Sequence, residues 1–254
     1  MGIIRAVFGY TLKEHLRHKV WLSAALFGLV LLGGGVVVSA LAQDERARMM
    51  LDLGLAANEA IALVSVVFLT VHLVLQEIES RAVFLILTHP VKRSHYLLGR
   101  FLGTLAAVAL GMLAMGAAHW LVLGLFGGAP LGKYAVAWAC TLGKTAVMGA
   151  LSLLLSLALT SEAAAMAFAL FFWTLGHFTS EMRFLAERSG SAPLKTAIVA
   201  FASAAPDFAR FDFRNSWHAA GGGRAWLAWA AAYALLYTAA CLALAIQLFE
   251  QREF

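Results

Sequence analysis

Residues 101–132 read FLGTLAAVALGMLAMGAAHWLVLGLFGGAPLG, a run that contains no Asp, Glu, Lys or Arg. An α-helix needs about 20 apolar residues to cross the hydrocarbon core of a bilayer. The run is therefore long enough for a membrane-spanning helix followed by a turn at Gly127, Gly128 and Pro130. The same test, applied outward along the chain, decides the fold class.

Five further runs are free, or nearly free, of charged residues. Tyr134–Ser161 carries a single charge, Lys144. The others are Val20–Gln43, Ala60–Gln76, Ala163–Ser180 and Ala225–Phe249. We therefore predict an all-α polytopic membrane protein with six transmembrane helices, folded as a single transmembrane domain over residues 1–254.

The composition agrees with this class. Of 254 residues, 62% are apolar and 13% are charged, against roughly 25% charged in a soluble domain. The net charge is +5, but the basic residues flank apolar runs, a pattern typical of orientation in a bilayer and not of nucleic-acid binding. Cys140 and Cys241 both lie inside apolar runs, which predicts buried thiols and neither a disulfide nor a metal pair.

Basic residues in the short flanking segments predict the orientation, because they favour the cytoplasmic side. They gather in the first 19 residues and in the segment after the second run, whereas the first loop balances Arg46 and Arg48 with acidic residues. These basic residues are Arg5, Lys13, Arg17, Lys19, Arg81, Lys92, Arg93 and Arg100. We expect both termini and the second connection in the cytoplasm, and the connection 181–224 outside.

The first 19 residues carry their own pattern. Ile4, Phe8, Leu12 and Leu16 recur at every fourth position and form one helical stripe. This predicts an amphipathic helix over residues 1–19 that lies in the cytoplasmic interface with its apolar side toward lipid. The alternative is an ordinary solvated start of a helix.

The segment 77–100 predicts a cytoplasmic elbow between the second and third spans. It opens with Glu77, Glu79 and Arg81, which are too polar to remain in lipid, and Pro90 then disfavours helix at the preceding residue. Gly99 and the following Gly103 form a small-xxx-small pair that permits close helix approach. Such an elbow either transmits a displacement from a soluble partner to the spans, or it is a structural loop that keeps its two helices oriented.

Residues 87–93, LTHPVKR, followed by residues 96–100, YLLGR, resemble the elbow of type-two ABC exporter permeases. The resemblance is to the NosY-like branch, which is associated with copper-enzyme maturation. A softer resemblance is residues 206–211, PDFARF, to the Pro-Asn-x-x-x-Phe segment of that family, with Asp207 in the place of Asn. The matching elbow residues are Glu77, Ile78, Arg81, Leu87, Thr88, Pro90, Val91, Arg93, Leu97, Leu98, Gly99 and Arg100.

This resemblance implies the permease subunit of an ATP-driven exporter in a bacterial cytoplasmic (inner) membrane. Such a permease pairs with a second copy or a homologue, and cytoplasmic ABC ATPase subunits dock at its elbow. The residues that would couple to the ATPase are Glu77, Glu79, Arg81, Thr88, Pro90, Lys92 and Arg93. The substrate stays unidentified, and the segment 181–224 is compatible with an extracytoplasmic protein partner.

The chain itself is predicted not to be an enzyme and to bind no cofactor. The run Gly127 to Lys133 has the spacing of a phosphate loop, but Tyr134 stands where a Ser or Thr would hold magnesium. Gly143-Lys144-Thr145 has the end of that motif without its first glycine. ATP and magnesium are thus expected on the partner ATPase.

Polar residues inside the apolar runs leave several interpretations open. Lys144 either lines a translocation path for an anionic substrate or has a structural role. In the structural role it forms an ion pair, or its long side chain extends to the membrane interface. His72, His119 and His177 lie in different runs, which predicts hydrogen-bonded core histidines and no metal site.

Asn58 and Glu59 are predicted to cap the second span. The rival functions are an ion-driven secondary transporter and a non-transporting membrane assembly protein. Co-purification of an ATPase bound at the elbow would separate the exporter from both.

Overall fold

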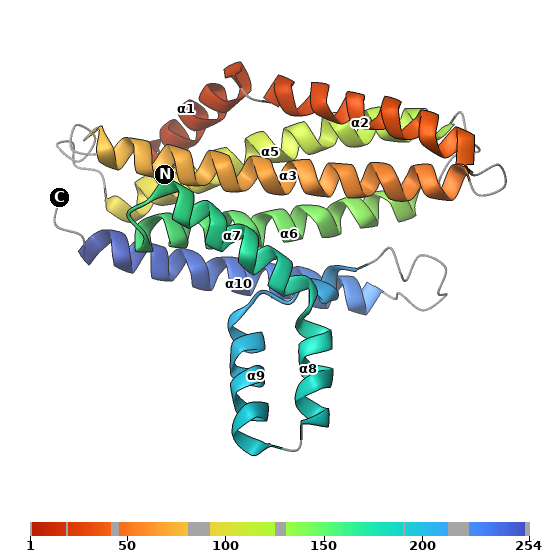
Figure 1. The fold of residues 1–254 in the computed structure, drawn as a ribbon. Coiled ribbons are helices and arrows are strands. Elements are labelled where there is room, and N and C mark those ends of the chain that lie inside the picture. Colours follow the sequence, from red (N-terminus) through yellow and green to blue (C-terminus); the bar gives the residue numbers. More distant parts are fainter. Residues whose placement is uncertain are drawn as a thin grey trace.

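In the computed structural model, the residues described are 2–18, 20–41, 46–80, 92–124, 131–189, 191–212 and 224–251, and these contain helices and no strand. The all-α prediction is confirmed for this part of the chain (Figure 1). The helices are α1 (Gly2–His18), α2 (Val20–Leu41), α3 (Arg46–Glu79), α5 (Arg93–Gly124), α6 (Leu131–Ala158), α7 (Glu162–His177), α8 (Thr179–Arg188), α9 (Ala192–Ala204), the 3-10 helix η1 (Phe208–Phe211) and α10 (Arg224–Gln251).

Four of these helices are long and apolar enough to cross a bilayer: α3, α5, α6 and α10. A fifth span results if α7 and α8 form one broken span, since the two are bent by 61°. Helix α2 has 22 residues, and its apolar stretch Ala25–Gly35 is shorter than these spans. The described helices thus support four or five spans, where the sequence predicts six.

Helix α3 corrects the predicted second span, because it begins at Arg46 and not near Ala60. Met50 and Leu55 are buried against Leu123 and Tyr134, so residues 46–59 of the supposed first loop belong to a packed helix. The Nε2 atom of His119 donates to the Met50 carbonyl oxygen at 3.0 Å and ties this extension to α5.

Asn58 and Glu59 are therefore not helix caps. Both lie in the interior of α3 and are buried. The Nδ2 atom of Asn58 donates to the Met112 carbonyl oxygen at 3.3 Å, and Glu59 accepts from Lys144. A search for charge-free runs interrupts the helix at Glu59 because it cannot anticipate that partner.

The bundle is built around α3, α5 and α6. Helix α6 packs against α3 on one side and α10 on another, while α1 packs on α5 and α2 on α3 (Figure 1). The core residues Val67, Met112 and Met148 are fully buried. Large apolar side chains also face outward on α5 and α10, among them Leu121, Trp229 and Leu236, as expected for helices that lipid surrounds.

Helix α1 lies against the start of α5 through the two glycines of the predicted small-residue pair. A Cβ atom at Gly99 would lie 2.8 Å from the Cβ of Val7, and one at Gly103 would lie 2.6 Å from the Cβ of Thr11. Real Cβ atoms do not approach so closely, so the contact requires glycine at both positions. The predicted close approach is confirmed, and its partner is α1.

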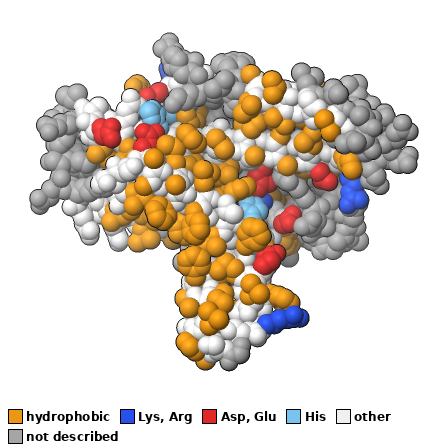
Figure 2. Space-filling view, in the orientation of Figure 1, with side chains coloured by type: hydrophobic (Ala, Val, Ile, Leu, Met, Phe, Trp, Pro, Cys, Tyr) orange, Lys and Arg blue, Asp and Glu red, His pale blue; other side chains and the backbone are white. Residues whose placement is uncertain are grey.

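Helices α8 and α9 form a hairpin that stands out sideways from the long helices (Figure 1). Figure 2 shows apolar side chains over much of this projection, and Phe184, Leu185 and Leu194 are exposed. At its base the hydroxyl of Thr179 donates to Asp207 Oδ1 at 2.9 Å, and Arg210 Nε donates to Oδ2 at 3.1 Å. The returning chain passes so close to α7 that a Cβ at Gly176 would lie 2.4 Å from the Pro206 carbonyl oxygen.

Candidate functional site: the base of the elbow

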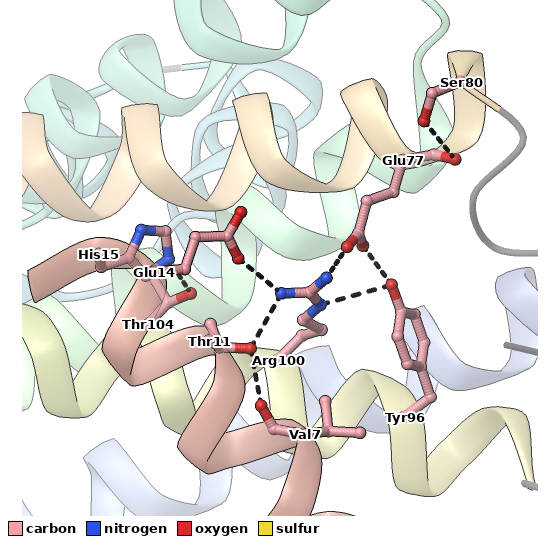
Figure 3. A network of polar contacts seen from close by, with 9 residues as sticks. All are labelled: Val7, Thr11, Glu14, His15, Glu77, Ser80, Tyr96, Arg100 and Thr104. Atoms are coloured by element: carbon pink, nitrogen blue, oxygen red, sulfur yellow. Dashed lines mark hydrogen bonds and ion pairs between the residues drawn. The ribbon is translucent and has the colours of Figure 1, made fainter. Parts of the chain in front are cut away.

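The two described ends of the predicted elbow, residues 77–80 and 92–100, meet at Arg100, about two turns into α5. Its side chain is 5% exposed, which places a permanent charge inside the protein. Figure 3 shows Glu77 from the end of α3 and Tyr96 from α5 around the guanidinium, with Thr11 and Glu14 from α1. One arginine therefore joins three helices.

Each nitrogen of this guanidinium has a partner. Nη1 donates to Glu14 Oε2 and to Thr11 Oγ1, both at 3.0 Å. Nη2 pairs with Glu77 Oε1, and Nε donates to the Tyr96 hydroxyl at 3.4 Å. That hydroxyl in turn donates to Glu77 Oε2, so Arg100 and Tyr96 together hold both oxygens of Glu77 (Figure 3).

Aromatic rings and a second hydrogen bond complete the cluster. The Arg100 Cζ atom lies 5.2 Å from the centre of the Tyr10 ring and 5.7 Å from that of Tyr96, within the range of cation–π attraction. One turn further along α5, Thr104 and His15 share a hydrogen bond of 3.1 Å. Helix α1 is thus fixed to α5 by polar contacts as well as by the two glycines.

The energetic weight of the cluster follows from its burial. Removing one partner of a buried ion pair leaves the other charge uncompensated, at a cost of about 3–5 kcal/mol. A lysine at position 100 would supply a point charge without the planar fork that reaches Glu14 and Glu77 together. The arrangement therefore requires arginine.

A second contact ties the same region to the last helix. Arg93 Nη1 donates to the carbonyl oxygens of Phe249 at 3.0 Å and Glu250 at 3.3 Å. Both carbonyls lie in the last turn of α10, where basic side chains commonly hydrogen-bond to the helix end. The rings of Tyr96 and Phe249 stack beside them with centroids 6.2 Å apart.

The structure places the predicted coupling residues in three groups. Glu77 belongs to the Arg100 cluster, and Arg93 contacts α10. Glu79 and Lys92 are exposed at the two points where the described chain leaves and re-enters the bundle. The remaining predicted residues, Arg81, Thr88 and Pro90, lie outside the described residues.

Sequence reasoning missed the centre of this cluster. In the sequence, Arg100 is a flanking basic residue and a position that matches the family pattern, and no linear pattern marks Glu14, Thr11 or Tyr96 as its partners. The sequence does contain one indication of this cluster. Arg100 directly precedes the charge-free run that begins at residue 101, and a charge at the start of such a run needs a partner. Nothing in the linear pattern says that this partner comes from the first helix.

Lys144 lies deep in the bundle and has a partner. Its Nζ atom donates to Glu59 Oε1 at 2.8 Å, and His177 Nε2 lies 3.6 Å from the same oxygen. The side chains of Lys144 and Glu59 are each 11% exposed. This geometry is that of an internal ion pair across α3 and α6, next to the bend between α7 and α8.

Each of the three histidines has a hydrogen-bond partner, as predicted, but only His119 is a core residue, because the side chains of His72 and His177 are 43% and 35% exposed. His72 Nδ1 lies 3.0 Å from Glu162 Oε1, His119 Nδ1 lies 3.0 Å from the Tyr134 hydroxyl, and His177 Nδ1 donates to the Trp173 carbonyl oxygen at 3.0 Å. Across the described ranges, no three His, Cys, Asp or Glu side chains are grouped so that they could hold a metal ion.

Long apolar helices, outward-facing apolar side chains and internal ion pairs define an integral membrane protein with several spans. Comparison with known families then gives its identity. The model of the ABC-2 family transporter proteins matches residues 57–254, which is well over half of the chain. The chain belongs to this family. No curated protein sequence matches it significantly.

Family membership fixes several properties of the chain. It is the membrane permease of an ABC transporter and has no ATPase activity of its own. Permeases of this family work together with ABC ATPase subunits, and they typically bind no cofactor.

Proposed function

We propose that the chain exports an unidentified substrate from a bacterial cytoplasm by coupling its elbow, residues 77–100, to cytoplasmic ABC ATPase subunits. It does so paired with a second copy or a homologue. The observation that carries this proposal is the double attachment of the elbow. At its two ends Glu77 and Arg100 pair with each other, Arg100 also binds Glu14 of α1, and Arg93 donates to the last turn of α10.

Rigid attachment is what a coupling element needs. A displacement applied at the exposed Glu79 or Lys92 reaches α3 and α5 directly, since these residues lie at the end of one helix and just before the other. Through Arg100 it also reaches α1, and through Arg93 it reaches α10. Four helices thus respond together to one contact outside the hydrocarbon.

The proposed topology has six spans with both termini and the elbow in the cytoplasm. Helix α2 supports the additional span, because its 22 residues exceed the roughly 20 needed to cross the hydrocarbon core. The basic residues near the elbow, among them Lys92, Arg93 and Arg100, support the orientation. On this topology the α8–α9 hairpin lies near the outer surface, where an extracytoplasmic partner could reach it.

The NosY-like branch is proposed from the residues alone. Of its matching positions, Glu77, Arg93 and Arg100 make the contacts just described, and Gly99 admits α1. Asp207 departs from the pattern of that branch, yet its carboxylate accepts from Thr179 and Arg210 at the hairpin base.

One observation favours the ion-driven rival. Glu59, Lys144 and His177 gather buried charge beside a broken helix, and secondary transporters place such features at their binding sites. Membership of the ABC-2 family argues against this rival, because permeases of that family work with ABC ATPase subunits, whereas an ion-driven carrier would transport without an ATPase.

The deciding experiment is capture of the ATPase. The full chain, tagged and purified from its native membrane, should bring down an ABC ATPase that mass spectrometry identifies. The exposed pair Glu79→Lys with Lys92→Glu should lose it, whereas Asp52→Lys, an exposed change near the other end of α3, should keep it. Equal capture by both variants would reject the elbow as the docking site, and ATP-independent transport would favour the rival.

A further inference from the structure

A cavity of about 530 Å³ lies between α2, α3 and α5. Its walls are almost entirely apolar and include Leu26, Val64, Phe68 and Met115. The first three of these side chains are about half exposed, so the cavity opens sideways at the surface that faces lipid. This volume lies within the roughly 300–1,000 Å³ of sites that hold one drug-sized molecule.

Two polar side chains stand at one end of the cavity. His72 of α3 and Glu162, the first residue of α7, both line it and lie 3.0 Å apart between Nδ1 and Oε1. Each is only partly buried, with 43% and 39% of the side chain exposed. The first turn of a helix favours a negative charge, so Glu162 presents a carboxylate at this end.

The cavity is elongated along α3. Its lining runs from Ala60 to His72, a distance of about 18 Å at 1.5 Å per residue. The pair His72–Glu162 lies toward the elbow end of α3, while Ala60 and Met115 lie further along the bundle. The shape suits a single hydrocarbon chain with a polar head at one end.

We propose that this cavity binds a single-chain cationic amphiphile, with its chain between α3 and α5 and its ammonium group at Glu162 and His72. The apolar walls would contact the hydrocarbon chain, and the carboxylate of Glu162 favours a positively charged head group. This names a substrate class for the exporter and rests on the proposed function only in treating the amphiphile as cargo. Binding itself requires no ATPase.

The test uses the full chain alone, reconstituted in phosphatidylcholine nanodiscs. The probe is dodecylamine that carries a diazirine at the far end of its chain. Photolysis should label peptides that contain Ala60 or Met115. Unmodified dodecylamine should prevent the labelling at roughly tenfold lower concentration than dodecanol, the scale of one charge-assisted hydrogen bond. Dodecyl sulfate should not compete.

Two variants and their controls separate the chain site from the head site. Val64→Trp fills the mouth of the cavity and should abolish the labelling, whereas Val37→Trp, an equally exposed valine on α2 that does not line it, should not. Glu162→Gln should remove the preference for dodecylamine over dodecanol, and Asp52→Asn should keep it. Thermal unfolding identifies any variant that is misfolded.

Three outcomes would overturn the proposal. They are labelling spread evenly over lipid-facing helices, insensitivity to Val64→Trp in a folded protein, and competition by dodecyl sulfate as strong as that by dodecylamine. The labelling experiment does not depend on ATP, so a failure to capture an ATPase would not affect its interpretation. Conversely, an empty cavity leaves the coupling proposal untouched.

Discussion

The carboxylate of Glu77, at the end of α3, and the guanidinium of Arg100, in α5, form an ion pair that joins the two ends of the elbow. The pair is largely buried, with 15% and 5% of the two side chains exposed. It also recruits Glu14 of α1, so the first helix of the chain belongs to the same rigid unit.

Arg100→Ala should destabilise the protein by about 3–5 kcal/mol, because the largely buried Glu77 then loses its counter-charge. Arg100→Lys should recover only part of the loss, since an ammonium cannot replace the planar fork. Thermal unfolding of the purified chain in nanodiscs measures both. If Arg100→Ala were as stable as the wild-type protein, the Arg100 cluster would not contribute to the stability of the fold.

Gly99→Ala should weaken the contact between α1 and α5 by about 1–3 kcal/mol, the usual cost of overpacking. The added methyl would meet the Val7 side chain at 2.8 Å and the Ile4 carbonyl oxygen at 3.2 Å. Gly9→Ala is the matched control, because nothing lies within 4 Å of its Cβ position. It should stabilise helix α1 by roughly 0.5–1 kcal/mol. A reversed order in unfolding measurements would contradict the packing of α1.

Lys144→Met should leave the Glu59 carboxylate buried without its cation and cost about 3–5 kcal/mol. The double change with Glu59→Gln removes both charges and should restore most of that stability. Substrate-stimulated ATP hydrolysis in the reconstituted complex then decides the role of the pair. Full stimulation in the double variant assigns the pair to structure, while selective loss of stimulation with intact assembly assigns it to the substrate path.

Asp207→Asn should have a small effect on stability, up to about 1 kcal/mol, because its two ion-pair partners, Arg183 at 3.3 Å and Arg210 at 3.1 Å, are about half exposed and screened by water. The amide oxygen can still accept from the Thr179 hydroxyl. Asp207→Ala removes that acceptor too and should be clearly worse. Protease resistance of the α8–α9 hairpin in intact vesicles is the measurement, and equal sensitivity of the two variants would refute this account of the hairpin base.

A cysteine at Ser94 should react with an impermeant reagent only after the cytoplasmic face is opened. One at the exposed Ser191 should react from outside in intact cells. The reason is the positive flanks of the elbow, which favour the cytoplasmic side. The reverse pattern would invert the orientation, and two cytoplasmic labels would remove at least one span.

The helical class was predictable because charge-free runs are a direct consequence of lipid as solvent. The bounds of α3 were not, since Glu59 is neutralised by Lys144, 85 positions along the chain. The same limit applies at the elbow. The Gly99 and Gly103 spacing predicted a close helix contact, yet only the folded chain shows that α1 makes it.

For Arg93 the sequence predicts a role at the elbow but not its contact partner. Its place beside Lys92 predicts a surface charge for a soluble partner, and Lys92 is indeed exposed. The Arg93 side chain instead meets the carbonyl oxygens of Phe249 and Glu250. Carbonyls at a helix end leave no mark in the sequence, so such a contact appears only in three dimensions.

The attachment of α1 also bears on how the protein is made. Glu14 and its partner Arg100 are 86 positions apart, and α1 leaves the ribosome long before α5 does. Until α5 is inserted, α1 has no glycine-lined surface on which to settle and must wait at the membrane surface. The oldest segment of the nascent chain therefore docks only after α5 has been made. A ribosome stalled before Arg100 would hold an insertion intermediate whose amino-terminal helix is open to proteases and to the signal-recognition machinery.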